Sequence, residues 1–219
     1  APMSATAKEK LLAHLDLQDE VGAFSDEAFE ELGRLVEAIR LENVYPAPLD
    51  TLDKVVGRWD TDFAHFGGKH SAGKPKVHDS DLKLQSFNRF PAAPIRVTRI
   101  CQEISQTGNA YNNVIDFICS DGDTRGVLIV HGRFRPDEEN RQRFHVEFVA
   151  TELRPGEDCD APALLAALGL DAAQPLKVDL KPPRLYSDVV YLDDDIRINI
   201  GGLGGLYLMR RASDAPVSI

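Results

Sequence analysis

The sequence predicts a mainly β protein, an antiparallel β-barrel with an N-terminal helical segment packed on it. Apolar residues recur at three- and four-residue steps up to Ile39, as in amphipathic helices, and at two-residue steps from Leu52 onward, as in strands. Gly, Pro, Asn or Asp bound the period-two segments, which is typical of tight turns between antiparallel strands. We therefore expect one structural domain, with the helical segment in residues 1–50 and the barrel in residues 51–219.

The N-terminal segment predicts two helices. Thr6 and Glu9 have the spacing of a capping box, in which each side chain accepts a hydrogen bond from the other residue's backbone N–H. Ser25 is of the residue type that caps a second helix. The apolar side of that helix comprises Phe29, Leu32, Leu35, Val36 and Ile39. An amphipathic helix of this kind packs on a larger body, which is here the predicted barrel.

Period-two alternation predicts the strands. Residues 143–148 alternate most regularly, with three apolar side chains on one face and three polar side chains on the other. The other predicted strands are residues 59–65, 82–87, 95–104, 110–119, 126–134, 193–200 and 206–211. An Ala- and Leu-rich stretch at residues 161–168 predicts a short helix, and Pro182 and Pro183 predict a connection across the surface. Short antiparallel strands in this series indicate a sandwich or an up-and-down barrel.

Composition restricts the compartment and the partners. The formal net charge of −10 disfavours nucleic acid and anionic membrane surfaces, because both repel an acidic protein. No apolar run reaches the roughly 18–20 residues of a transmembrane helix, so any association with lipid is expected to be peripheral. Pairing across a turn near Gly108 places Cys101 opposite about residue 116, so a disulfide with Cys119 is not expected. Cys101, Cys119 and Cys159 are expected to be free thiols of a soluble protein in a reducing compartment, such as the bacterial cytoplasm or a plastid.

The sequence carries no recognisable motif of catalysis or metal binding. His65, His70 and His78 match no zinc-ligand spacing. Residues 193–195 are three consecutive Asp, but alternation along a strand sends the middle carboxylate to the opposite face. Neither a nucleophile elbow nor a Cys nucleophile signature occurs. We therefore expect no metal, no other cofactor and no enzymatic activity.

Gly57-Arg58-Trp59 is similar to the Gly-x-Trp motif of lipocalin-like barrels. In those barrels the Trp closes one end, and the Gly lets the backbone pass close beside it. An Arg of the last strand stacks over the indole in the same barrels. The resemblance therefore implies that Arg211 covers Trp59 by a cation–π contact, with the guanidinium within about 6 Å of the ring.

Two longer runs resemble the plastid-lipid-associated (PAP/fibrillin) family. The central hairpins carry Gln102-Glu103-Ile104, the run GNAYNNVI at residues 108–115, and RFHVEF at residues 143–148. The C-terminal run is more specific, since YLDDDIRI at residues 191–198 is followed by GGLYLM at residues 204–209 and by Arg211. The apolar turn at residues 199–203 and the Gly- and Lys-rich segment at residues 67–76 depart from the family's pattern.

The resemblance assigns barrel closure and the family motif to Gly57, Trp59, Tyr191, Asp193, Asp195, Arg197 and Arg211. Asp193, Asp195 and Arg197 lie two residues apart, so in an extended segment they would share one face. A carboxylate–guanidinium pair on that face would fix the register of the strands if it were partly desolvated. On a solvated face the same pair would contribute little.

A barrel of about eight strands has room for one small ligand among its inward-facing side chains. Alternation assigns to this lining Trp59, Phe63, His65, Val114, Phe144, Val146 and Phe148. The family resemblance implies that the ligand is lipophilic, for example a carotenoid, a quinone or other isoprenoid, or another lipid. The leading hypothesis is therefore binding or sequestration of a lipophilic small molecule without catalysis.

Two alternative functions are open at this point. A scaffold protein would use the N-terminal helices and residues 67–76 to recruit an enzyme of lipid or quinone metabolism, and side chains would fill its barrel. A barrel isomerase acting on a lipid would need an ionisable group in the cavity, for which His65 is the candidate. An apolar cavity of about 300 Å³ or more that opens to solvent would favour the binding hypothesis.

Overall fold

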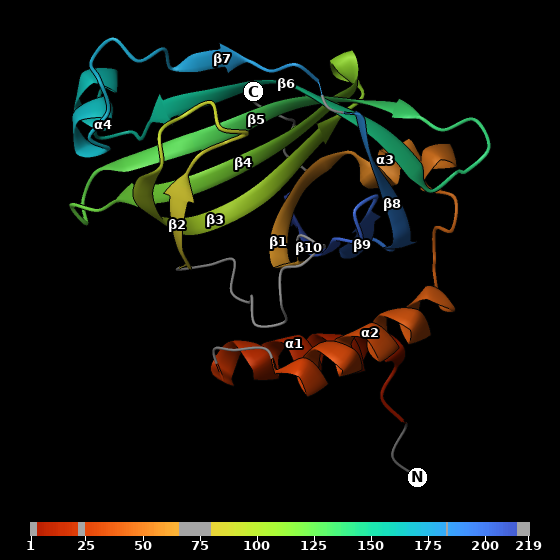
Figure 1. The fold of residues 1–219 in the computed structure, drawn as a ribbon. Helices are drawn as coiled ribbons and strands as arrows, with labels where there is room; N and C mark the ends of the chain where they lie inside the picture. The colour runs from red at the N-terminus through yellow and green to blue at the C-terminus, as the bar shows by residue number, and fades with distance from the viewer. Residues whose placement is uncertain (1–3, 22–24, 66–79, 183, 214–219) are drawn as a thin grey trace.

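The computed structural model describes residues 4–21, 25–65, 80–182 and 184–213. A curved antiparallel sheet closes into a barrel, and two long helices cross its outer surface (Figure 1). The protein is mainly β with N-terminal helices, which confirms the predicted fold class. Among the described residues, no helix has the length and apolar character needed to cross a membrane.

Eight strands form the closed barrel. They are β1 (Gly57–His65), β3 (Ala93–Ser105), β4 (Ala110–Cys119), β5 (Arg125–Pro136), β6 (Arg143–Pro155), β8 (Arg184–Leu192), β9 (Ile196–Gly201) and β10 (Leu206–Ser213). The barrel closes because β1 pairs antiparallel with β10 on one side and with β3 on the other. Two short strands extend the sheet, β2 (Ser80–Leu84) beside β3 and β7 (Lys177–Asp179) beside β6.

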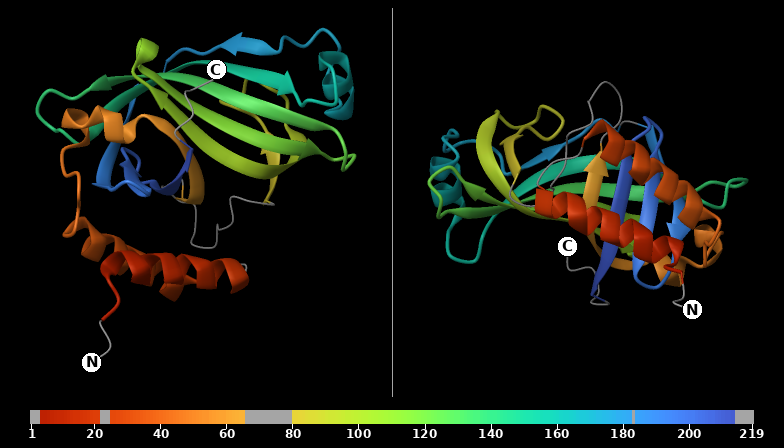
Figure 2. Two further views of the ribbon diagram at one scale, coloured as in Figure 1. Left: turned by 180° about the vertical axis from the view of Figure 1, so that it is seen from behind. Right: turned by 90° about the horizontal axis from the view of Figure 1, so that it is seen from below.

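The two long helices cover the barrel on the side of β8, β9 and β10 (Figure 2). The predicted capping box begins α1 (Ala7–Val21): Thr6 N donates to Glu9 Oε2 at 2.8 Å, and Glu9 N donates to Thr6 Oγ1 at 3.2 Å. Ser25 caps α2 (Asp26–Arg40), as predicted. One apolar cluster joins the helices to the outer face of the barrel, and it includes Leu11, Leu15, Leu32, Val36, Ile39, Phe63, Ile196, Ile198 and Leu208.

Short helices lie at the two ends of the curved sheet (Figure 1). The 3₁₀ helix η1 (Pro48–Asp50) and α3 (Leu52–Val55) lead into β1, and a second 3₁₀ helix, η2 (Thr107–Asn109), joins β3 to β4. At the far end, α4 (Ala161–Ala167) contributes to an apolar cluster that includes Leu164, Leu168, Phe117, Leu128 and Leu153. The barrel is therefore packed at both ends of this sheet.

Two of the predicted strand boundaries are wrong, and one strand of the barrel was not predicted. The strand predicted at residues 82–87 ends at Leu84, because Ser86, Phe87 and Asn88 adopt positive φ angles that interrupt an extended chain. The strand predicted at residues 193–200 begins at Ile196, because the three Asp residues form a turn. β8 begins at residue 184, after the connection predicted from the two prolines, and no strand was predicted over residues 184–192. Residue 183 lies outside the described residues.

The three cysteines are free thiols, as predicted. Cys101 pairs with Val114 across β3 and β4, rather than with about residue 116, and Cys119 pairs with Ile95. Burial raises the pKa of the Cys101 and Cys119 thiols to about 11, so both are protonated at neutral pH. Both side chains therefore act as small apolar residues of the core.

Candidate ligand-binding cavity

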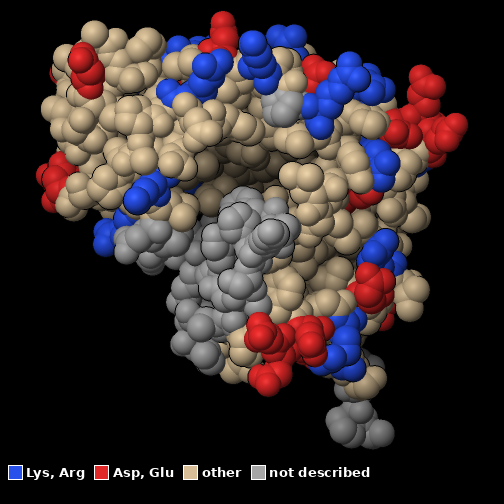
Figure 3. Space-filling model, in the orientation of Figure 1, with Lys and Arg blue, Asp and Glu red and all other residues tan. Residues whose placement is uncertain are grey.

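A cavity of about 260 Å³ lies inside the barrel. The surface is hollowed below the curved sheet (Figure 3), and Leu203 and Tyr186 at the cavity's edge are 76% and 37% exposed. The cavity therefore reaches the surface beside these two residues. A second hollow of about 220 Å³ continues along the sheet, and Ile115 lines both. The cavity alone is somewhat below the usual size of small-molecule sites, about 300–1,000 Å³, and a ligand that also occupied the second hollow would come within that range.

The cavity walls are largely apolar. The inward faces of β3, β4, β6, β8 and β10 contribute Ile100, Ile115, Val146, Phe148, Leu185 and Met209. The turn between β9 and β10 contributes glycines, of which Gly202 lies against Tyr186. A Cβ atom on Gly202 would lie 2.7 Å from that ring, so glycine permits the close approach at the edge of the cavity.

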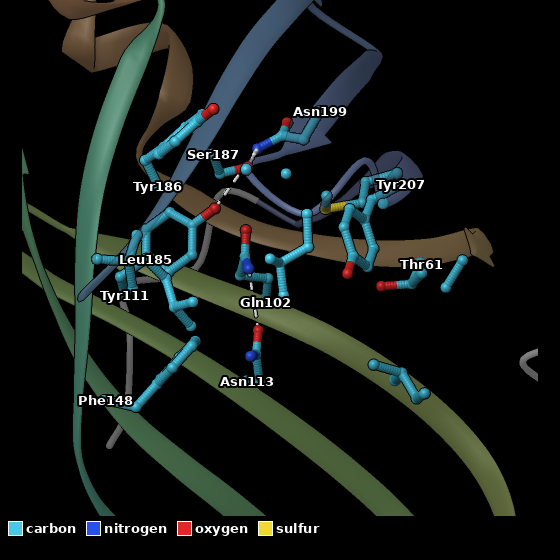
Figure 4. Close-up of a pocket in the computed structure, with 18 of the residues that line it drawn as sticks. Thr61, Gln102, Tyr111, Asn113, Phe148, Leu185, Tyr186, Ser187, Asn199 and Tyr207 are labelled. Carbon is cyan, nitrogen blue, oxygen red and sulfur yellow. Dashed lines mark hydrogen bonds between the residues drawn. The ribbon is translucent and has the colours of Figure 1, made fainter. Parts of the chain in front are cut away.

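A group of uncharged polar side chains gathers at one end of the cavity (Figure 4). Asn199 Nδ2 donates to Ser187 Oγ at 2.9 Å and to the Tyr111 hydroxyl at 3.4 Å. Gln102 Nε2 donates to Asn113 Oδ1 at 2.9 Å. We call this end, which comprises Gln102, Tyr111, Asn199 and Met209, the polar floor of the cavity.

Arg197 lies directly behind the polar floor and is completely buried. Its Nη2 donates to Gln102 Oε1 and to Met209 Sδ, the latter at 2.8 Å, and its guanidinium lies 5.1 Å from the centre of the Trp59 ring. Its Nε and Nη1 have no hydrogen-bond partner among the residues that the structure describes. No carboxylate in the described part of the chain forms a salt bridge with it. Burial lowers the pKa of the guanidinium to about 10, so it remains charged at neutral pH.

The end of the barrel at Trp59 is closed by satisfied contacts. The indole Nε1 donates to the Val55 carbonyl at 2.8 Å, and the Arg211 guanidinium lies 4.2 Å from the ring centre, which confirms the predicted cation–π contact. Arg211 also donates to the carbonyl oxygens of Lys54, Val56 and Asp194. We call Trp59, Arg211 and the carbonyls that they contact the closed end.

The structure places only two of the seven predicted lining residues on the cavity wall, Val146 and Phe148. Trp59 and Phe144 are buried in the core cluster next to the cavity. Val114 belongs to a different cluster, with Cys101 and Ile129, because these residues alternate with the cavity-lining positions of their strands.

Alternation predicted that Phe63 and His65 line the cavity, and this prediction is wrong. A register shift between Thr61 and Phe63 in β1 reverses the alternation, so that Thr61 and Ala64 line the cavity instead. Phe63 and His65 contact Phe29 of α2, with ring centres 6.2 Å and 4.7 Å apart. Both therefore face the helices outside the barrel.

The predicted pairing of Arg197 with Asp193 and Asp195 is wrong. The acidic residues lie in the turn between β8 and β9, so their alternation with Arg197 is broken. Asp193 Oδ1 accepts from the backbone N–H groups of Asp195 and Ile196, and its Oδ2 accepts from the Tyr191 hydroxyl at 2.7 Å. Lys8 Nζ lies 2.8 Å from Asp193. The acidic motif thus fixes the turn and attaches α1 to it.

Sequence reasoning missed the polar floor. Tyr111 and Asn113 lie on the face of β4 opposite to Val114, and the prediction from alternation placed Val114 on the inward face. The usable signal was the pair of polar residues two apart in β4, together with the inward Gln102 of β3. Arg197 was assigned to the family motif but not to the interior.

A closed antiparallel barrel with an interior cavity, one end sealed by Trp and Arg, is the architecture of lipocalin-like proteins. The profile of the PAP_fibrillin family matches residues 5–210, and the chain belongs to that family. Searches of curated proteins and of solved structures each found no match.

Metal ligation has no support from the described residues, since they contain no group of three His, Cys, Asp or Glu side chains that could hold an ion. His70 and His78 lie outside the described residues, as does the segment 67–76.

Proposed function

We propose that the protein binds a lipophilic small molecule inside its barrel, without catalysis. The observation that carries this proposal is the cavity itself, whose walls are apolar and whose edge reaches the surface at Leu203. Burial of an apolar ligand against such walls contributes about 25 cal/mol per Å² removed from water. Membership of a lipid-associated family is consistent with a ligand of this kind.

The cavity gives less support to the two alternative functions. A scaffold with a filled barrel does not require a hollow of this size. A barrel isomerase requires an acid or base that exchanges protons near neutral pH. Among the described residues that line the cavity, the ionisable side chains are tyrosines, and burial raises the pKa of Tyr207 further. His65, the candidate base, faces α2.

A titration with a neutral fluorescent lipid tests the proposal. Parinaric acid methyl ester is a polyene whose fluorescence rises when it leaves water for an apolar site. Leu185→Trp places a large side chain in the cavity from a partly buried position, and Arg184→Trp adds the same residue at the neighbouring exposed position. Wild type and Arg184→Trp are expected to bind the ester saturably, whereas Leu185→Trp should weaken binding by at least about tenfold, or 1.4 kcal/mol.

Equal binding by both tryptophan variants would place the lipid outside the cavity and contradict the proposal. Native mass spectrometry of gently purified protein gives a second readout, because a bound lipid adds a defined mass. The same adduct should be absent from Leu185→Trp and present in Arg184→Trp.

A further inference from the structure

Arg197 is a buried cationic side chain without a counter-ion among the described residues. It is fully buried, two of its nitrogen atoms lack hydrogen-bond partners, and its nearest polar contacts, Gln102 and Met209, are uncharged. A buried charge without a counter-ion costs several kcal/mol, and proteins normally compensate it by pairing. Within the described chain no carboxylate pairs with Arg197, and the Trp59 ring at 5.1 Å supplies only a cation–π contact.

We propose that the polar floor is the head-group site for a lipid carboxylate, which enters the cavity head first and forms an ion pair with Arg197. This inference rests on the proposed function and names its ligand class, an amphipathic lipid with one negative charge. Gln102 and Met209, through which Arg197 contacts the cavity, are themselves lining residues. A ligand that reaches the floor therefore lies one side chain away from the guanidinium.

Met209 is the side chain that the ligand would displace from Arg197. Its thioether sulfur is a weak acceptor, although it takes a bond from the Nη2 of Arg197 at 2.8 Å. The side chain has three rotatable bonds and adapts to irregular packing. A carboxylate oxygen in place of the sulfur would accept from Nη2, and the second oxygen would accept from the unpartnered Nη1. This is the bidentate geometry in which guanidinium and carboxylate groups bind most strongly.

Tyr111 adds a further donor at the same place. Its hydroxyl oxygen accepts from Asn199 Nδ2, which leaves the hydroxyl proton to be donated. In Figure 4 the Tyr111 hydroxyl points toward the polar floor, beside Gln102 and Asn199. The floor thus offers donors from a cation and a hydroxyl to one incoming oxygen group.

A neutral carbonyl, as in a quinone, satisfies this site less well. It can accept from one or two donors, but it brings no charge to neutralise the guanidinium. A carboxylate brings both the charge and enough lone pairs for the three donors. Its hydrocarbon tail would lie along the apolar walls, past Phe148 and Ile115, and toward the second hollow at Leu128.

The test compares two ligands that differ only at the head group, parinaric acid and its methyl ester, on wild-type protein at neutral pH. The acid is expected to bind at least about tenfold more tightly, because only the acid forms the ion pair. Equal affinities, or a preference for the ester, would overturn the inference and leave the proposed function standing. If neither ligand bound, the proposed function would fail, and this inference with it.

Substitutions of Arg197 test whether this side chain causes the preference for the acid over the ester. Arg197→Met should lower the affinity for the acid to that for the ester, while the affinity for the ester stays the same. Arg197→Lys keeps the charge and should retain part of the preference. Arg211→Lys changes the other arginine over Trp59 and should leave the acid-to-ester ratio unchanged. An unchanged ratio in Arg197→Met would contradict the assignment, and the wild-type comparison decides the inference even if that variant folds poorly.

Discussion

Two arginines contact the Trp59 indole, Arg211 at the closed end and Arg197 behind the polar floor of the cavity. They differ in whether their hydrogen-bond donors have partners. Arg211 lies 4.2 Å from the centre of the Trp59 ring and donates to three backbone carbonyls. Arg197 lies 5.1 Å from that ring, has no exposed surface and keeps two unpartnered nitrogens. Satisfied polar groups stabilise a fold, and unsatisfied ones mark places where the fold has been adapted to function. The arginine of the closed end is therefore satisfied within the fold, whereas Arg197 is the group to which we assign the proposed lipid carboxylate.

Replacing the shared indole should have the largest effect. Trp59→Ala removes a fully buried side chain that contacts both arginines and donates to the Val55 carbonyl. We expect a loss of about 3–5 kcal/mol in the free energy of unfolding, as is usual for large core residues. Chemical denaturation followed by circular dichroism measures it. A loss below about 1 kcal/mol would show that Trp59 does not hold the closed end together.

Removing the guanidinium at the closed end should have the second-largest effect. Arg211→Met keeps an apolar stem but leaves the carbonyls of Lys54, Val56 and Asp194 without their donor. We expect a loss of about 2–3 kcal/mol in the same denaturation assay, typical of hydrogen bonds to charged groups. Arg143→Met is the matched control, since Arg143 also lies over an aromatic ring, but it pairs with the Asp188 carboxylate and donates to no backbone carbonyl of the closed end. That control should cost about 0–1 kcal/mol. Equal losses in the two variants would contradict the special role of the closed end.

The acidic turn next to the closed end should give a smaller effect that depends on pH. Although burial disfavours its charge, hydrogen bonds from Lys8, Tyr191 and backbone N–H groups lower the pKa of Asp193. Its contribution is therefore complete above the unfolded-state pKa of about 3.9 and declines as the pH falls below that value. Asp193→Asn should cost about 1 kcal/mol at neutral pH. The difference from wild type should shrink between about pH 4 and pH 2. A difference that did not change with pH would show that the charge of Asp193 is unimportant.

The barrel and its closed end could be predicted from the sequence because their signals are local or lie in compact motifs. Alternation over residues 143–148 places Val146 and Phe148 on the cavity wall, and the Gly57-x-Trp59 motif together with Arg211 predicts the cation–π contact. The first feature follows from the two-residue period of a strand. The second joins residues of two distant strands, and the resemblance to lipocalin-like barrels implied that contact.

The cavity lining was harder to predict because a bulge or turn of one to three residues changes which side chains of a strand face inward. One register shift in β1 turns Phe63 outward and Thr61 inward, and periodicity does not locate such a bulge. The turn at residues 193–195 separates Arg197 from the acidic residues and sends it into the barrel. An isolated buried arginine is rare, so the spacing of two residues favoured a pair between Arg197 and the neighbouring carboxylates.

The stability of Arg197→Met, measured with and without parinaric acid, tests the contrast between the two arginines most directly. Exchanging an uncompensated buried charge for an apolar side chain should leave the free energy of unfolding unchanged or raise it by about 1 kcal/mol. Parinaric acid should raise the unfolding midpoint of wild type more than that of the variant, since stabilisation by a ligand grows with its affinity. A variant that lost about 2 kcal/mol or more without ligand, yet was stabilised by the acid as much as wild type, would contradict the account.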